Sequence, residues 1–151
     1  MDTHTANKAL IAPLRAAMYD FSETGVRAAL AGIAPDAVFR HCHPFGEIAG
    51  GAAFYDRAYA GLLRAWPDLE RRDWIVMAGR DAGGADWVGC GGHYTGIFRA
   101  PWLDIPPTGH LVTMRFHEFY RVEDDKIVEV QAIWDIPEVM LQAGAWPLAP
   151  A

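Results

Sequence analysis

The chain has 151 residues, of which 52% are hydrophobic and 21% charged, and its formal net charge is −6. This length fits one domain that buries about 70% of the surface of the unfolded chain. The acidic balance, without a Lys/Arg cluster, argues against nucleic acid and membrane surfaces as partners. Cys42 and Cys90 form no C-x-x-C motif or disulfide framework, and the N-terminus lacks the pattern of a signal peptide. We therefore expect a soluble, cytoplasmic protein.

Three helices are predicted in the first half of the chain. Apolar residues recur at helical spacing from Ala9 to Asp20, and Ser22 is placed to cap a second helix that ends near Ala31. A short strand, 37–43, stops at Pro44. The pair Gly50-Gly51 opens the third helix, which ends at 66–68.

Four mainly antiparallel strands are predicted in the second half. The first two, 72–78 and 85–98, flank a turn at 81–84, and the later one holds glycines at 89, 91, 92 and 96. Glycine inside a strand marks a bulge, a bend or a close backbone approach, so we expect the sheet to curve there. Helices gathered before strands favour an α+β fold. We predict a cone-shaped barrel in which three N-terminal helices pack on a curved, mainly antiparallel sheet, as one domain over 1–151 with its core at about 9–143.

The last two strands form a long hairpin from Thr108 to Asp135, with an acidic turn at 123–126. We expect Val122 to pair with Ile127, because these residues flank the turn. Side chains alternate between two faces, so this register places Tyr120 opposite Glu129, Glu118 opposite Gln131, Phe116 opposite Ile133, and Met114 opposite Asp135. A charged group on a largely apolar sheet face either reaches the rim of the sheet or lies in a functional pocket. Asp135 is the residue that we expect to carry chemistry.

Five motifs together resemble the SnoaL-like polyketide cyclases of the nuclear transport factor 2-like superfamily. The resemblance covers about residues 9–143. Its motifs are His43-Pro44 before Gly50, Ala65-Trp66-Pro67-Asp68-Leu69, Gly92-His93-Tyr94-Thr95-Gly96, Pro106-Pro107-Thr108-Gly109, and Arg121 through Lys126-Ile127 to Asp135. The resemblance implies an intramolecular aldol condensation on a polyketide ester, with an aspartate as acid/base, no metal or cofactor, and a homodimer. Asp135 matches the family's aspartate at the end of the last strand.

This chain departs from the family pattern at two places. The family commonly has Gly-Thr-His-x-Gly, whereas here His93 stands one residue earlier and Tyr94 takes the place of the histidine. A shift of one residue turns a strand side chain to the other face, so both residues are candidates for the pocket. The loop from Arg99 to Asp104 is also longer than usual, which would alter the mouth of the pocket.

Aldol closure needs a base that removes a proton next to a carbonyl and a donor that stabilises the enolate. Burial against apolar walls raises the pKa of a carboxyl group and makes it a better base. Asp135 is the expected acid/base, although it also fits a helix cap for the segment after it. Glu118 is the expected second carboxyl group, unless it lies at the rim and pairs with Arg115 or Arg121. A serine nucleophile has no support, because no Gly-x-Ser-x-Gly motif occurs and the only serine is Ser22.

The substrate is expected to be a small hydrophobic molecule with a carbonyl group. Apolar walls with a few aimed polar groups are typical of such pockets. The candidate substrate-binding residues are His43, Gln131, Tyr94, His93, Met114, Phe116, Ile133 and Trp66. His41 and His43 lie two apart, but no third ligand is apparent, so no metal is expected.

Two other functions fit the same fold. One is a non-catalytic module that binds a ligand or a second copy of the chain. The other is an epoxide hydrolase, which would need an Asp–Arg–Asp set around a water inside the cone. Arg115 falls on the wrong face for that set in our register, so the hydrolase ranks lower.

Overall fold

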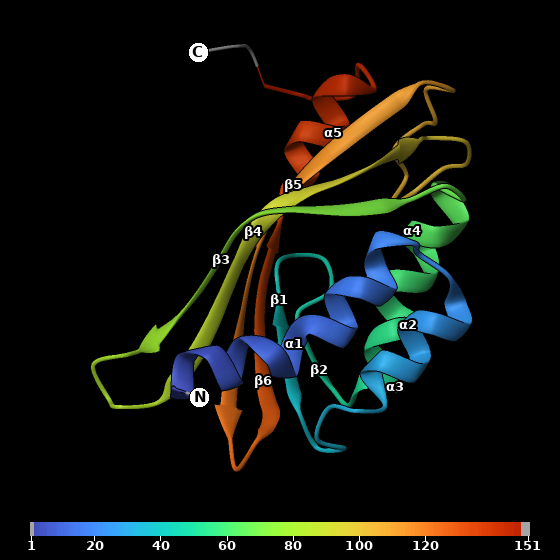
Figure 1. Cartoon of the computed structure of the whole chain (residues 1–151). Coiled ribbons are helices and arrows are strands. Elements are labelled where there is room, and N and C mark those ends of the chain that lie inside the picture. The colour runs from blue at the N-terminus through green and yellow to red at the C-terminus, as the bar shows by residue number, and fades with distance from the viewer. Residues whose placement is uncertain (1, 149–151) are drawn as a thin grey trace.

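The computed structural model describes residues 2–148 and has an α+β fold, in which helices cover one face of a single sheet (Figure 1). The helical elements are α1 (Thr3–Tyr19), α2 (Glu23–Leu30), α3 (Gly51–Phe54), the π-helical turn η1 (Tyr55–Tyr59), α4 (Ala60–Ala65) and α5 (Ile136–Gln142). The strands are β1 (Val38–His41), β2 (Glu47–Ala49), β3 (Glu70–Arg80), β4 (Asp86–Ile97), β5 (Leu111–Glu123) and β6 (Lys126–Trp134).

Side-chain caps fix where the first two helices begin. Asp2 accepts a hydrogen bond from the Thr5 backbone N–H at 3.0 Å, so α1 begins earlier than the predicted Ala9. Ser22 caps α2 as predicted, by accepting from the Gly25 N–H at 3.2 Å. The predicted third helix is one uninterrupted helical segment, in which the π turn η1 lies between α3 and α4. Its buried residues are Phe54, Tyr55, Ala58, Tyr59, Leu62 and Ala65.

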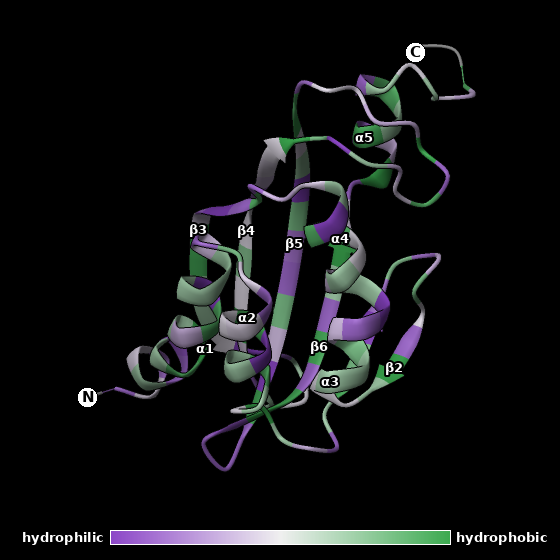
Figure 2. Cartoon of the chain, turned by 90° about the vertical axis from the view of Figure 1, so that its right-hand side faces the viewer, coloured by the Kyte–Doolittle hydropathy of each residue, from purple (hydrophilic) through white to green (hydrophobic). Residues whose placement is uncertain are grey.

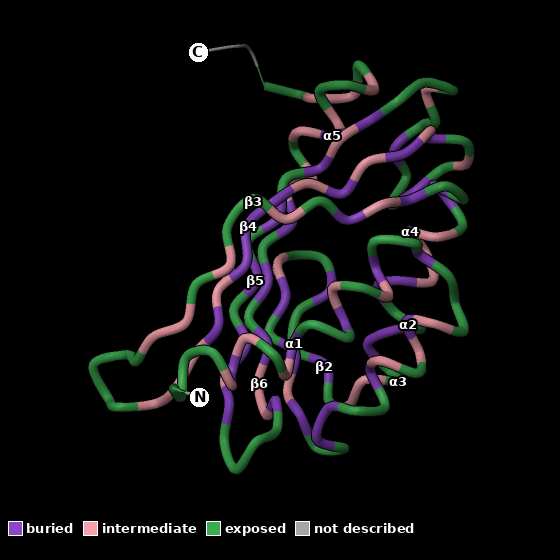
Figure 3. The backbone as a smooth tube through the Cα atoms, in the orientation of Figure 1, coloured by how far each residue is buried: buried purple, intermediate pink, exposed green. Residues whose placement is uncertain are grey.

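The sheet has the strand order β2-β1-β6-β5-β4-β3 and is antiparallel except for the pair β1–β6. It curves around the helices without closing into a barrel (Figures 1 and 2). The edge strand β2 was not predicted, because only three residues after the turn at Phe45-Gly46 pair with β1. The helices α1 to α4 cover the concave face, and the buried stretches of the tube lie between these helices and the sheet (Figure 3).

The predicted register of the hairpin is correct next to the turn and wrong beyond it. Val122 pairs with Ile127, but Arg121 pairs with Glu129, so Val128 is an extra residue in β6. This bulge moves every later residue of β6 by one position relative to β5. Glu118 therefore pairs with Ala132 rather than with Gln131.

The shift exchanges the two faces of β6. Trp134 pairs with Phe116 and is buried, whereas Ile133 pairs with His117 and is 64% exposed. Gln131 is also exposed on the outer face. The turn itself is tighter than predicted, because its two central residues, Asp124 and Asp125, both adopt left-handed backbone angles (φ 47° and 57°).

The glycines of β4 allow the close backbone approach that the sequence predicts. Gly92 lies opposite a bulge in β3 between Asp73 and Ile75, and a Cβ atom on Gly92 would collide with the Arg72 carbonyl oxygen. On the outer face, Gly89 leaves space for the ring of Phe119. The sheet bends and twists at this point without a side chain in the way.

Candidate functional site

Glu118 lies in the middle of β5, points toward the helices and is 1% exposed. Four donors surround its carboxylate. Arg71 Nη1 and Tyr120 OH both donate to Oε2 at 2.5 Å, and Tyr94 OH and Trp134 Nε1 donate to Oε1 at 3.0 and 3.1 Å. A buried carboxylate with this many donors is fully compensated for its lost hydration.

Arg71 connects this carboxylate to the surface between α1 and β3. Its guanidinium donates to Asp73 Oδ1 from Nη2 at 3.0 Å, and Arg15 of α1 donates to Asp73 Oδ2 at 3.0 Å. The same guanidinium lies 4.3 Å from the centre of the Phe116 ring, a cation–π contact. A buried arginine therefore stands between two carboxylates, Glu118 and Asp73.

The charges of this network are fixed by their surroundings. Burial alone would raise the pKa of Glu118, but Arg71 and the hydrogen bonds from Tyr120 and Trp134 outweigh it and lower that pKa below its ordinary value. Burial raises the pKa of Tyr94 and Tyr120 well above the usual range. Glu118 is therefore ionised at neutral pH, and both tyrosines are neutral donors.

His41, the last residue of β1, lies in an aromatic wall beside this network. Its ring packs edge-on to Trp134, with ring centres 4.2 Å apart, and it also contacts Phe45 and Phe54. Its Nδ1 atom lies 3.2 Å from Cys42 Sγ, whereas its buried Nε2 atom has no hydrogen-bond partner within residues 2–148. Burial lowers the pKa of His41 to about 4, against a smaller upward pull from Glu118. The imidazole is therefore neutral at pH 7.

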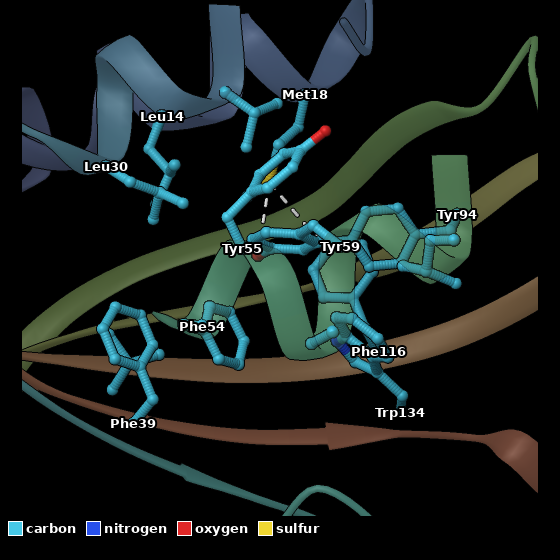
Figure 4. Close-up of a cluster of buried hydrophobic side chains, with 14 of the residues drawn as sticks. Leu14, Met18, Leu30, Phe39, Phe54, Tyr55, Tyr59, Tyr94, Phe116 and Trp134 are labelled. Atoms are coloured by element: carbon cyan, nitrogen blue, oxygen red, sulfur yellow. Dashed lines mark hydrogen bonds between the residues drawn. The ribbon is translucent and has the colours of Figure 1, made fainter. Parts of the chain in front are cut away.

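Four of the predicted substrate-binding residues come together inside the fold. Trp66, Tyr94 and Met114 line one interior gap with Leu62, Leu69 and Val112, and the Phe116 ring centre lies 4.9 Å from that of Tyr94. Figure 4 shows Tyr94, Phe116 and Trp134 with Tyr59 and Met18 in this packed interior. The gap has no room for a water molecule. The Nε1 atom of Trp66 is buried and, like His41 Nε2, has no partner among the described residues.

The other four lie away from this interior. Gln131 and Ile133 are on the outer face because of the bulge in β6. His43 is exposed, because β1 ends at His41 and the chain turns there. His93 points outward from β4 and packs edge-on to Trp74 at 4.2 Å. Tyr94, in contrast, faces inward, so of these two candidates Tyr94 is the one that lies in the interior.

Asp135 stands at the junction of β6 and α5 and is half-buried. Its Oδ1 atom accepts from the Glu138 N–H at 3.1 Å, which makes it the N-cap of α5. The helix-cap alternative for Asp135 is therefore confirmed, and its expected position opposite Met114 is wrong. Its backbone N–H donates to the Arg115 carbonyl at 2.8 Å and holds this corner against β5.

A family model described as SnoaL-like polyketide cyclase matches residues 12–143. The chain belongs to this family. The solved structures with similar folds agree with the assignment, although their identities of 21–24% show the fold alone. No curated protein matches the chain.

Three of these structures resemble this family member over nearly its full length. A candidate SnoaL-like polyketide cyclase from Jannaschia sp. CCS1 is 21% identical with a TM-score of 0.78, covering 99% of this chain and 97% of its own. AclR, a candidate hydroxylase from Streptomyces galilaeus, is 24% identical with a TM-score of 0.77, over 97% and 85%. IdmH, a candidate polyketide cyclase from Streptomyces antibioticus, is 23% identical with a TM-score of 0.73, over 91% and 98%.

Two of the four polar partners of Glu118 in this SnoaL-like chain, Arg71 and Trp134, are not predicted from the sequence. Arg71 was placed just outside the first strand, and Trp134 on the wrong face. Alternation along β3 places Arg71 and Arg72 on opposite faces of the sheet, but it does not indicate which of the two is buried. Nothing local in the sequence signals the bulge at Val128.

Two observations bear on the other expectations for this family member. No group of three or more histidine, cysteine, aspartate or glutamate side chains within residues 2–148 is placed to hold a metal ion. None of the helices in the same range is long and apolar enough to cross a membrane.

Proposed function

We propose that the protein catalyses enolate chemistry on a small, apolar molecule that carries a carbonyl group, as in the ring closure of a polyketide cyclase. The observation that carries this proposal is the pair of unpartnered polar atoms, His41 Nε2 and Trp66 Nε1, in an otherwise aromatic interior. A buried polar group without a hydrogen bond costs about 1–3 kcal/mol. A substrate oxygen or an acidic C–H group at these atoms would offset that cost.

In the proposed reaction, a base removes a proton from the carbon next to the substrate carbonyl. The electron pair of the broken C–H bond forms an enolate, whose oxygen accepts a hydrogen bond from Trp66 Nε1–H. The enolate carbon then attacks a second carbonyl of the same molecule, a C–C bond forms, and the alkoxide takes the proton back from the base. Oriented acid–base catalysis of this kind contributes about 10²–10⁴-fold in rate.

Two residues are candidates for the base. His41 is favoured by position, because its imidazole is neutral and its Nε2 atom faces the interior. Asp135 is favoured by the family motif, and one of its carboxylate oxygens has no hydrogen bond within the described chain. We assign Glu118 a positioning role instead, because its lone pairs are taken up and it acts on His41 through Trp134.

Deuterium exchange tests this proposal without knowledge of the natural substrate. The protein is incubated in heavy water with a panel of apolar β-ketoesters, for example ethyl benzoylacetate, and exchange next to the carbonyl is followed by NMR. We expect acceleration by the wild type and a loss of at least ~10²-fold in Asp135→Asn or in His41→Gln, whichever residue is the base. If the wild type accelerates exchange in none of the ketoesters, the enolate proposal fails.

Epoxide hydrolysis is a second candidate, and the structure supplies an observation that favours it. Glu118, Arg71 and Asp73 form an acid–arginine–acid set through two ion pairs in the interior. From the sequence, only Arg115 is considered as the arginine of such a set. Asp73 would take a proton from a water that attacks the epoxide carbon, the C–O bond would break, and the opened oxygen beside Arg71 would then take that proton from Asp73, while Glu118 would hold Arg71 in place. Incubation of styrene oxide in oxygen-labelled water would give a singly labelled diol.

A non-catalytic, ligand-binding role is supported by the fully bonded Glu118, whose lone pairs are not free to accept a proton from a substrate. It predicts tight binding of an apolar ketone that does not change in Asp135→Asn, with neither exchange nor diol formation.

We also propose a homodimer that forms through the outer face of the sheet. Two rows of residues cross four strands on that face: Met77, Gly89, Phe119 and Gln131, and next to them Ile75, Gly91, His117 and Ile133. These rows hold four of the ten large hydrophobic side chains that are exposed within residues 2–148. A groove of about 530 Å³ runs beside Met77 and Phe119. Apolar patches of this kind usually mark contacts.

A further inference from the structure

The loop between β4 and β5 places two apolar side chains in the interior, Trp102 and Ile105, of which Trp102 is the larger. Trp102 is 4% exposed although its neighbour Leu103 is exposed. Its ring centre lies 5.4 Å from that of Trp66 and 6.4 Å from those of Phe45 and Trp134. The indole of Trp102 therefore lies between two aromatic walls, each with an unpartnered polar atom. One wall carries Trp66 Nε1. The other consists of Trp134 and Phe45, against which His41 with its Nε2 atom packs.

The backbone of this loop is bonded only at its ends. Arg99 and Ala100 donate to the Ala65 carbonyl, and Gly109 donates to that of Phe98. Between them, the described residues 101–107 make backbone hydrogen bonds only to each other, through the mutual pair Trp102–Ile105 at 3.2 and 2.8 Å. The loop is held down by its two buried side chains, Trp102 and Ile105.

The tip of the loop is also strained. Leu103 and Asp104 have φ values of 50° and 62°, in the left-handed region that costs an L residue roughly 1–2 kcal/mol. Burial of the indole offsets this cost, because a large aromatic side chain stabilises the fold by about 2–3 kcal/mol when it leaves water. A ligand that takes the place of the indole removes the reason for the strained turn.

We infer that the space occupied by Trp102 is a ligand chamber and that its indole is a plug, which a ligand ring replaces when the loop 101–107 swings outward. This inference rests on the proposed function only in that the chamber is where the substrate would bind. The ligand it fits is planar, uncharged, and about the size of an indole, with an oxygen that can accept from Trp66 Nε1–H. An anionic ring is disfavoured by the buried charge of Glu118.

The test uses the fluorescent ketone acetyl-dimethylaminonaphthalene, a planar bicyclic probe whose emission changes in an apolar site, and follows binding by stopped flow. For the wild type we expect kobs to level off with rising probe concentration, because opening of the loop limits the rate. For Trp102→Ala we expect kobs to rise linearly and to exceed the wild-type plateau by at least ~10-fold. Leu103→Ala, at the exposed position next to the plug, is the matched control and should keep the plateau.

A second variant tests the hydrogen bond. Trp66→Phe keeps an aromatic wall but lacks the N–H, and it should raise the Kd of the probe about 10-fold, which corresponds to ~1.4 kcal/mol. The inference is overturned if kobs is linear and equal in the wild type and Trp102→Ala, if only Trp102→Ala binds the probe, or if Trp66→Phe leaves Kd unchanged.

Gated binding without deuterium exchange would reject the catalytic proposal alone, and exchange that is insensitive to Trp102→Ala would reject the plug alone.

Discussion

Arg71 Nη1 on β3 donates to Glu118 Oε2 on β5 at 2.5 Å, reaching across the intervening strand β4. Both side chains are almost completely buried. Such a pair gives little net stability relative to apolar side chains, but removing one partner leaves a buried charge without compensation. The bond thus ties three strands together and makes the interior intolerant of change at either end.

This ion pair predicts that substitution of two neighbouring arginines, Arg71 and Arg72, changes the free energy of unfolding by very different amounts. Arg71→Met should lower the free energy of unfolding by about 3–5 kcal/mol, because Glu118 loses its counter-ion in the interior. Arg72→Met is the matched control. Arg72 also forms an ion pair at 2.5 Å, with Glu70, but both side chains are about half exposed and the loss should be far smaller. Urea unfolding measures both, and equal losses would contradict the role of the buried pair.

The low pKa of His41 predicts a specific acid sensitivity. The folded-state pKa is about 4 and the ordinary value is 6.5, so below pH 6.5 the unfolded chain binds a proton that the folded chain does not. Stability from this group is therefore complete well above pH 6.5 and falls as the pH drops toward 4. The loss between pH 6.5 and 5 is roughly 1.6 kcal/mol, because the unfolded imidazole is already half protonated at pH 6.5.

His41→Gln should remove most of this slope. Glu118 acts in a different window, since its pKa is lowered from 4.5 and its contribution is lost only as the pH falls below that value. Urea midpoints at pH 7, 6 and 5 for the wild type and His41→Gln would separate the two. Parallel curves for the two proteins over this range would show that His41 is not buried as a neutral group.

Much of the fold follows from local signals in the sequence. Ser22 caps a helix because its hydroxyl satisfies an orphan N–H, and the acidic turn before Lys126 joins two strands because its residues tolerate left-handed angles. The order of helices before strands then leaves few alternatives to a sheet covered on one face. These features depend on residues that are neighbours in the chain.

The candidate site was harder to predict because it depends on register. One extra residue, Val128, turns Trp134 inward and Gln131 outward, and no local pattern distinguishes the two registers. Glu118 was expected inside, but its partner Arg71 comes from a strand that is two positions away in the sheet. Long-range pairs of this kind follow from packing and not from spacing along the chain.

The close approach at Gly92 gives a further test of the bent sheet. Gly92→Ala should cost at least ~2 kcal/mol, because the added methyl group would collide with the Arg72 carbonyl and break the pairing of β3 with β4. Gly79→Ala on β3 is the control, since a Cβ atom there meets nothing within 4 Å, and its effect should stay within ~0.5 kcal/mol. Thermal unfolding of the two variants measures both losses of stability. A Gly92→Ala variant as stable as the wild type would mean that β3 and β4 lie farther apart at this point.

The proposed dimer predicts a change of mass on a single substitution. Phe119 lies at the centre of the outer-face rows and is 47% exposed, so Phe119→Glu would place a charge in the middle of the interface. We expect the wild type to sediment at about twice the chain mass of 16.6 kDa and Phe119→Glu at that mass. The control is Leu141→Glu, which replaces an even more exposed apolar residue (61%) on α5, outside the rows, and should stay dimeric. A monomeric wild type at micromolar concentration would reject the dimer, and a Phe119→Glu dimer would move the interface to another face of the molecule.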